Sequence, residues 1–435
     1  ALLFLQVFLT AQAEDRLPMG VAFGGLALLS WVLYGIYRAA QRSAYELESL
    51  VFLLISIGAA VTAAYDPASL YKLLITVVMG MVLFLAMSGV LRDLHLSIRA
   101  RWPVAIAAGA LLAFNVVLGE RIFGAKNWIS IGPLSFQPSE LVKIAFILAG
   151  AATLDRLFAK RNLVFTILFS AYCVGCLALM SDFGTALIFF VAFLCIAFLR
   201  TGDLPSIAMM VAAAAFGCGI ILRFKPYIAD RFAAWRHAWD YAQDIGYQQT
   251  RTMSAMASGG LFGVGPKDGW LKYVGAANTD LVFGVVGEEF GFLLALCCVA
   301  ALVIPIVFTL RCAAAARSSF YTILSCATAA MLVCQMALNV LGAVDLLPLT
   351  GVTFPFVSMG GSSMISCWGL MAYLKAADTR QNASFALRLS KLAPQQQEKK
   401  AAPAPKARPK APQEGFFADR PDIPVDKIFG KEEDK

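Results

Sequence analysis

Long apolar runs recur along this chain, and each has about the length that a helix needs to cross a lipid bilayer. About 20 apolar residues span roughly 30 Å of hydrocarbon. Such runs fall near residues 18–37, 50–65, 71–91, 103–119, 139–155, 163–180, 183–199, 205–222, 281–310, 320–345 and 355–375. Charged residues make up only 15% of the chain, below the roughly 25% that is typical of soluble domains. The sequence therefore predicts an all-α fold, a polytopic transmembrane helical bundle.

A shorter apolar stretch, residues 1–12, comes before these runs. Ala11-Gln12-Ala13 resembles the cleavage site of a signal peptide, but no basic region precedes the stretch and many spans follow it. We therefore interpret residues 1–12 as a truncated first transmembrane helix, with cleavage as the alternative.

Lys and Arg residues gather in short segments that lie on one side of the membrane if the spans simply alternate. They are Arg38, Arg42, Arg92, Arg99, Arg101, Arg156, Lys160, Arg161, Arg200, Arg311 and Arg317. Cytoplasmic segments carry this excess, so we predict that the long segment 223–280 is extracytoplasmic. The net charge of +8 has the same origin, and we expect no nucleic-acid partner.

The composition changes in residues 377–435, where Lys and Arg alternate with Ala and Pro. Such a segment cannot bury enough apolar surface to offset the entropy lost on ordering. We predict a disordered, basic cytoplasmic tail. A contact with anionic lipid or with a partner through Phe416-Phe417 or Ile428-Phe429 is the alternative.

The chain contains only two histidines, His95 and His237, so a His-rich metal site or a Ser-His-Asp triad is not supported. Cys173 and Cys176 form a CxxC motif, but it lies inside an apolar run without a βαβ pattern, which favours helix packing over redox chemistry. A general base in this chain is therefore expected to be a carboxylate.

The first polar segment on the predicted outer side is residues 124–140, which leads into the span that contains Lys143. Glu140 and Lys143 are one helical turn apart, so we expect them to pair and to lower the cost of charge at membrane depth. Pro138 or Ser139 suits the start of that helix. Trp128 is typical either of a membrane interface or of a ligand site.

The second segment is Ser181-Asp182-Phe183-Gly184-Thr185, between two apolar runs. Asp182 is expected to cap the helix that follows, a role that is compatible with function.

The third segment is the long loop, and it carries Gln248, Arg251, a glycine cluster at 258–265, and Thr279-Asp280. The cluster lacks the Gly-Lys-Ser/Thr of a P-loop and follows no strand, so we expect its glycines to allow tight turns or a close ligand.

Glu288 and Glu289 lie in the apolar run after Asp280. At 1.5 Å per residue, Glu288 would lie about 12 Å deeper in the same helix. Such buried carboxylates need partners inside the bundle, and Lys143 is one candidate.

Cations and tryptophans are interleaved along the long loop that precedes Asp280: Lys225, Arg231, Trp235, Arg236, Trp239, Arg251, Lys267, Trp270 and Lys272. Cations beside an amphipathic aromatic surface suit a membrane lipid that carries phosphate groups. An interfacial helix with snorkelling charges is the alternative for 235–239.

These motifs together resemble the SEDS family (shape, elongation, division and sporulation), which includes RodA and FtsW. The matching segments follow the family's order: 124–129, 136–140, 182–186, 246–248, 258–263, 279–280, 287–289, 347–351 and 355–363. The resemblance implies a ten-span membrane core at 50–376, with the extra N-terminal segments at 1–49. The chain differs at Asn278, where many members have His, and at Met359, where Tyr is common.

The resemblance also implies an enzyme that polymerises lipid II into the glycan strands of peptidoglycan at the outer face of a bacterial cytoplasmic membrane. Asp280 matches the family's essential aspartate, and Trp128 its important tryptophan. A class B penicillin-binding protein, which is a transpeptidase, is the implied partner. We expect the substrate site to include Trp128, Glu140, Lys143, Asp182, Gln248, Arg251, Ser258, Gly259, Gly260, Thr279, Ser358, Gly360, Gly361 and Ser362.

Such a glycosyl transfer needs a base for the acceptor hydroxyl and positive charge for the pyrophosphate that leaves. We assign Asp280 as the general base and Arg251 as the first choice of cation, with a divalent ion, Mg²⁺ or Mn²⁺, as an optional addition. A lipid II flippase is the alternative, because Lys143, Glu288 and Glu289 also suit a transport path. A scaffold for the transpeptidase is the third reading.

Overall fold

The computed structural model describes residues 2–40, 42, 44–122, 124–131, 134–154, 160–224, 231–313 and 318–377. The predicted tail at 377–435 lies outside these residues except for Ala377, and so do Lys225 and Arg317. The chain divides into two compact units, residues 1–384 and 385–435, and the description below concerns the first.

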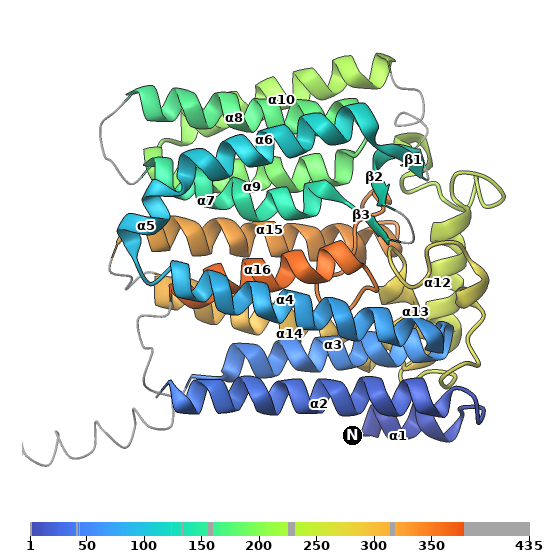
Figure 1. Cartoon of the computed structure of the whole chain (residues 1–435). Helices are drawn as coiled ribbons and strands as arrows, with labels where there is room; N and C mark the ends of the chain where they lie inside the picture. The colour runs from blue at the N-terminus through green and yellow to red at the C-terminus, as the bar shows by residue number, and fades with distance from the viewer. Residues whose placement is uncertain are drawn as a thin grey trace, which may run out of the picture. The chain divides into compact units, whose positions relative to one another are not determined.

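Long helices make up most of this unit and run side by side in Figure 1. They are α2 (Arg16–Ala39), α3 (Glu46–Tyr65), α4 (Leu70–Val90), α6 (Arg101–Leu118), α7 (Pro138–Leu154), α8 (Lys160–Leu179), α9 (Phe183–Thr201), α10 (Leu204–Phe224), α14 (Phe292–Ala313), α15 (Ser319–Ala343) and α16 (Gly361–Ala376). Among the described residues, seven helices are long and apolar enough to cross a membrane. The predicted all-helical transmembrane bundle is confirmed.

The core of the bundle lies around α3, α15 and α16, whose side chains are mostly buried. Gly80 of α4 lies directly under the ring of Trp368 of α16, and a Cβ at Gly80 would come within 2.5 Å of that ring. The small residue therefore lets the two helices approach closely. By contrast, α2 exposes most of its apolar side chains, as a helix in contact with lipid would.

The short elements of the two long polar segments gather at one end of the bundle, on the right in Figure 1. They are β1 (Glu120–Ile122), β2 (Ala125–Ile131), β3 (Leu134–Phe136), α12 (Tyr247–Gly259), η2 (Leu271–Tyr273) and α13 (Val282–Glu289). The three strands pair antiparallel in the order β1-β2-β3, with Ile129 opposite Phe136. The apolar pattern alone did not predict these strands, because the strands are too short to show a period.

Shorter helical pieces are also present among the residues that the structure describes. They are α1 (Leu2–Leu9), η1 (Pro67–Ser69), α5 (Leu94–Arg99) and the turn of helix at 231–234.

Two predicted spans differ from the structure. The run 281–310 is not one helix, because α13 ends at Glu289 and α14 begins at Phe292. Gly291 between them has φ +90°, and a Cβ there would lie 2.3 Å from the carbonyl oxygen of Leu261, so the chain turns at this point. The last span begins at Gly361 instead of near 355, because residues 355–360 form turns.

Candidate active site

Asp182 is buried and its carboxylate is fully bonded to neutral donors. Its Oδ2 accepts hydrogen bonds from Asn127 Nδ2 at 2.7 Å and from Gln137 Nε2 at 3.0 Å, and its Oδ1 accepts one from Thr185 N at 3.1 Å. The last bond confirms the predicted cap of α9. The two amides were missed from the sequence, although both stand inside the motifs that flank Trp128 and Glu140.

The segment 350–352 packs against the start of α9. A Cβ at Gly184 would lie 2.9 Å from Thr350 Cβ and 2.5 Å from Val352 Cγ2, so only glycine allows this approach. The segment 350–363 also meets the N-terminal end of α7, because Gln137 N donates to Ser362 Oγ at 3.0 Å. Ser362, predicted to bind substrate, therefore has its hydroxyl engaged within the protein.

The backbone on either side of Asp280 is fixed to the bundle. Asn339 Nδ2 donates to Asp280 O at 2.8 Å, and Ser358 Oγ donates to Thr279 O at 2.6 Å. Met359 N donates to Asn278 O at 3.0 Å. These bonds bring the predicted Thr279-Asp280 and Ser358 motifs together, and they give Ser358 a positioning role.

The side chain of Asp280 faces Gly351. A Cβ at Gly351 would lie 3.2 Å from Asp280 Oδ2, and the φ of +70° at this position also favours glycine. The pKa of Asp280 is raised to about 6, mainly by burial and to a smaller extent by the negative charge of Asp182, while the Thr279 hydroxyl and the charge of Arg231 oppose the shift. Such a carboxyl group changes its charge near neutral pH.

Arg231 is the cation that acts on Asp280. Its Nη1 donates to Leu349 O at 2.9 Å, two residues before Gly351, and its charge lowers the Asp280 pKa. Arg251, the first choice from the sequence, instead lies on α12 with its guanidinium 5.2 Å from the centre of the Tyr247 ring. We therefore place Arg231 in the site ahead of Arg251.

The predicted pair of Glu140 and Lys143 is confirmed at 2.8 Å between Oε1 and Nζ, and both side chains are buried. Lys143 Nζ also donates to Gln335 Oε1 at 3.0 Å. Gln335 Nε2 in turn donates to Thr353 O at 3.0 Å. The pair therefore supports the segment 350–363 from within the bundle.

The sequence predicted Glu288 on one long span that begins at Asp280, which is wrong, because Glu288 lies on a short helix that ends before α14 begins. It belongs to α13, and its carboxylate accepts hydrogen bonds from Trp270 N at 2.8 Å and Leu271 N at 3.0 Å. The prediction that Lys143 pairs with Glu288 or Glu289 is also wrong, because Lys143 is bonded to Glu140 and Gln335. The break at Gly291 turns α13 away from the span.

The predicted substrate residues of α12 hold the loop together. Gln248 Nε2 donates to Gly275 O at 3.0 Å, and Ser258 Oγ donates to Ala255 O at 2.7 Å. A Cβ at Gly259 would lie 2.2 Å from the carbonyl oxygen of Gly287, so α12 and α13 touch backbone to backbone. The glycine cluster at 258–265 therefore makes tight turns and close packing, as predicted.

The remaining predicted residues flank this site. Trp128 is partly exposed on β2, where it pairs with Glu120. Gly260 has φ +55° and ends α12, while Gly360 and Gly361 form the start of α16.

Comparison with known proteins identifies the family. The sequence model described as "Cell cycle protein", which covers FtsW, RodA and SpoVE, matches residues 37–383. The chain belongs to this FtsW/RodA/SpoVE family. It is 28% identical to a probable peptidoglycan glycosyltransferase FtsW of Saccharophagus degradans over 78% of this chain and 93% of that one. It is 29% identical to the peptidoglycan glycosyltransferase RodA of Mycobacterium leprae over 80% and 82%.

Solved structures agree with the FtsW/RodA/SpoVE assignment. A chain from the structure titled "Structural coordination of polymerization and crosslinking by a peptidoglycan synthase complex" matches with a TM-score of 0.66 and 25% identity. The match covers 78% of this chain and 99% of that chain. RodA of Thermus thermophilus has the same fold, with a TM-score of 0.59 and 24% identity over 78% and 98%.

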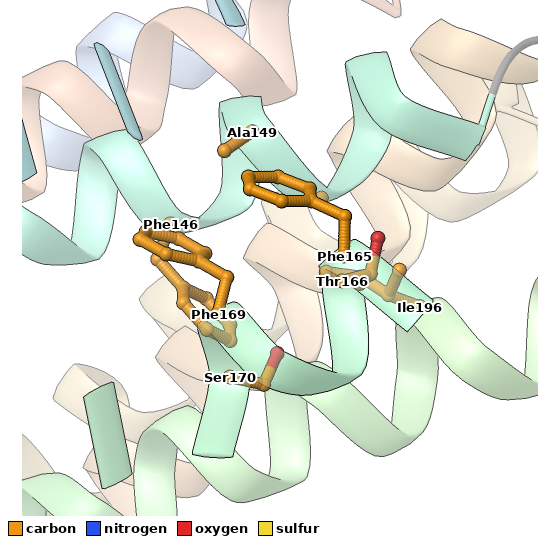
Figure 2. A pocket seen from close by; sticks show the side chains of 8 residues that line it. Phe146, Ala149, Phe165, Thr166, Phe169, Ser170 and Ile196 are labelled. Carbon is orange, nitrogen blue, oxygen red and sulfur yellow. The ribbon is translucent and has the colours of Figure 1, made fainter. Parts of the chain in front are cut away.

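A second feature of this FtsW/RodA/SpoVE member lies away from Asp280, in a crevice between α7, α8 and α9. Figure 2 shows the rings of Phe146, Phe165 and Phe169 beside Thr166 and Ser170. The crevice is too narrow for a water molecule.

Metal binding by this family member was left open by the sequence. Within the described ranges, no group of three His, Cys, Asp or Glu side chains could hold a metal ion. The oxygens of Asp182 are already bonded to protein donors. A divalent cation at Asp280 would therefore take most of its ligands from substrate phosphates and water, which suits Mg²⁺.

Proposed function

We propose that this protein is a peptidoglycan glycosyltransferase that polymerises lipid II into glycan strands, with Asp280 as the general base. Its FtsW and RodA relatives bear the name peptidoglycan glycosyltransferase. The observation that carries the assignment to Asp280 is its surroundings: the carboxyl group faces a glycine, and burial raises its pKa to about 6. A base of that pKa is mostly ionised at pH 7 and still accepts a proton readily.

The proposed reaction is one displacement. The 4-hydroxyl of a GlcNAc attacks the anomeric carbon of the second lipid-linked chain, and its proton moves to Asp280. The bond between that carbon and the pyrophosphate oxygen breaks, and polyprenyl pyrophosphate leaves with the electron pair. Arg231, which is near Asp280, supplies positive charge for the departing group. Magnesium, when bound, would add further positive charge at the pyrophosphate.

A single available carboxylate favours inversion at the anomeric carbon. Retaining glycosidases use a second carboxylate about 5 Å away as a nucleophile. The nearby Asp182 does not suit that role, because three donors hold its oxygens. We therefore infer single displacement without a glycosyl-enzyme intermediate.

We also infer the orientation and the partner. The end of the bundle that carries α12, α13 and Asp280 faces the outside of a bacterial cytoplasmic membrane, because the short loops at the other end carry Arg92, Arg99 and Arg200. A class B penicillin-binding protein is the proposed partner, since a related solved complex coordinates polymerization with crosslinking.

Purified protein in nanodiscs, incubated with fluorescent lipid II, tests this function. We expect long glycan strands on a gel from the wild type and a loss of at least about 100-fold in Asp280→Asn, because a positioned base contributes about 10²–10⁴-fold. Asp244→Asn is the matched control, since Asp244 is exposed in the same long loop. Strands made at the full rate by Asp280→Asn would contradict the assignment.

A folding control separates lost chemistry from lost structure. The raised pKa means that ionised Asp280 disfavours the folded state above about pH 6, so Asp280→Asn should not lower the thermal midpoint at pH 7.5. Transfer of lipid II across the bilayer without strands would instead support a flippase. If the wild type gives neither strands nor transfer, alone or with a transpeptidase, the scaffold role is the reading that remains.

A further inference from the structure

An ion pair joins the N-terminal hairpin, α1 and α2, to the long polar loop. Asp15 lies in the turn between the two helices, and its Oδ2 is 2.7 Å from Lys267 Nζ. The two side chains are only 26% and 23% exposed. Figure 1 shows this turn at the same end of the bundle as α12 and α13. A segment at the start of the chain therefore contacts the loop that leads to Asp280.

Lys267 lies at the tip of a turn whose first half is fastened to α13. Val264 N donates to Glu288 O at 2.9 Å, and Gly265 N donates to Glu289 O at 3.1 Å. Lys267 itself has φ +70°, a conformation that residues other than glycine seldom adopt. The surrounding contacts thus hold the Lys267 backbone in one shape and direct its side chain to the hairpin.

The second half of the turn is fastened to the same helix and continues to Asp280. The Glu288 carboxylate accepts hydrogen bonds from Trp270 N and Leu271 N at 2.8 and 3.0 Å. Further turns follow without a break, and Asp280 N donates to Ala276 O at 3.0 Å. Residues 264–289 therefore form one connected body that carries Lys267 at one place and Asp280 at another.

This body has two attachments of interest. Near Asp280, the side chains of Asn339 and Ser358 bond its backbone to the bundle. At Lys267, the attachment is Asp15 of the hairpin. Every residue of α13 is buried, so the part of this body that the second attachment can steady is the stretch 264–281, which ends beside the catalytic carboxylate.

The hairpin is itself anchored, so it can resist such motion. Met19 and Leu33 of α2 are fully buried against the bundle. At the other end of α2, Tyr37 Oη donates to Glu48 Oε1 at 2.6 Å, and Lys375 Nζ lies 3.1 Å from the same oxygen. Residues 2–36 lie outside the range that the family's sequence model matches, so the hairpin adds to the matched core.

We propose that the α1–α2 hairpin is a strut that holds residues 264–289 in the position that the Asp280 site requires. Asp15 and Lys267 are then positioning residues, because neither contacts the reacting atoms. The structural part of this proposal stands alone, and its consequence for the rate rests on the proposed glycosyltransferase function.

Hydrogen exchange on the full chain in nanodiscs tests the strut directly. Asp15→Lys replaces attraction with repulsion, and we expect exchange in residues 264–280 to rise about fivefold, as fits the loss of a partly exposed ion pair. Glu14→Lys is the matched control, because Glu14 is its exposed neighbour and undergoes the same charge change. The control should leave exchange in 264–280 within about twofold of the wild type.

A charge swap separates the ion pair from general damage. Lys267→Asp is compatible with the positive φ, since Asp adopts that conformation more readily than most residues. The double variant Asp15→Lys/Lys267→Asp should restore protection, and with it the rate of strand formation that Asp15→Lys lowers about fivefold.

Three outcomes decide the proposal. Unchanged exchange in Asp15→Lys would overturn the strut, whatever the activity. Raised exchange that the charge swap does not restore would overturn the role of this pair. If Asp15→Lys raises exchange and the charge swap restores protection, but the wild type makes no strands, the strut would be supported and the proposed function rejected.

Discussion

Asp182 and Asp280 both lie beside the segment 350–352, and their surroundings differ. The Asp182 oxygens accept three hydrogen bonds from side-chain amides and a backbone N–H, which fix the position of the carboxylate. Asp280 has its backbone fixed by Asn339, while its side chain faces Gly351 and has a pKa raised to about 6. Asp182 is thus held by the protein, while the surroundings of Asp280 are those that the proposed general base needs.

Glu289 is a third acidic residue to compare, and it differs from Asp280 in how accessible its carboxylate is. Burial also raises the pKa of Glu289, to about 7, against the effects of the Lys267 backbone N–H and the Lys272 charge. However, Glu289 is only 1% exposed, and its Oε2 is buried without a hydrogen-bond partner. Asp280 is partly exposed, so it can meet a sugar hydroxyl that Glu289 cannot reach.

Asp182→Ala tests the structural half of the comparison and has the largest expected effect on stability. It removes the acceptor of two buried donors and of the part-buried Gln137 amide, at about 1–3 kcal/mol for each buried donor left unsatisfied, so we expect a loss of about 3 kcal/mol. Thermal unfolding in detergent measures the change. Asp203→Ala is the control, because the carboxylate of exposed Asp203 accepts hydrogen bonds from Ser206 at the start of α10 and its loss should cost about 1 kcal/mol. Equal thermal midpoints for Asp182→Ala and Asp203→Ala would contradict the structural role of Asp182.

Gly351→Ala tests the chemical half. The new Cβ would lie 3.2 Å from Asp280 Oδ2, so we expect strand formation to slow about tenfold as access to the carboxylate narrows. Gly202→Ala is the matched control, since Gly202 has a similar φ of +63° and no atom within 4 Å of the added Cβ. Rates are measured with fluorescent lipid II at saturating concentration. If both variants slow strand formation by the same factor, backbone strain and not access to the carboxylate would be the cause.

The sequence predicted the membrane bundle and the pair of Glu140 and Lys143 because both depend on local information: the length of apolar runs and the spacing of a helical turn. It also predicted the Asp182 cap, which involves residues only three apart. The contact of Asn127 with Asp182 spans 55 residues, and no local pattern indicates it.

The wrong single span at 281–310 and the preference for Arg251 over Arg231 both reflect contacts between distant parts of the chain. Glu288 stands in an apolar run that reads as one helix, and only the contact of Gly291 with the distant Leu261 backbone shows why the helix breaks. From the sequence, Arg251 was the first choice among the basic residues of the long loop, which also include Arg231. In the structure, Arg231 contacts Leu349, which lies more than 100 residues further along the chain. It also acts on Asp280, which lies about 50 residues further along.

The pH dependence of strand formation tests most directly the claim that Asp280 accepts the proton. The rate at saturating lipid II should fall about tenfold per unit below a midpoint near pH 6, where Asp280 becomes protonated. Arg231→Gln should raise that midpoint, because the Arg231 charge holds the Asp280 pKa down. A rate that stays constant from pH 5 to 8, or a midpoint that Arg231→Gln leaves unchanged, would contradict the account.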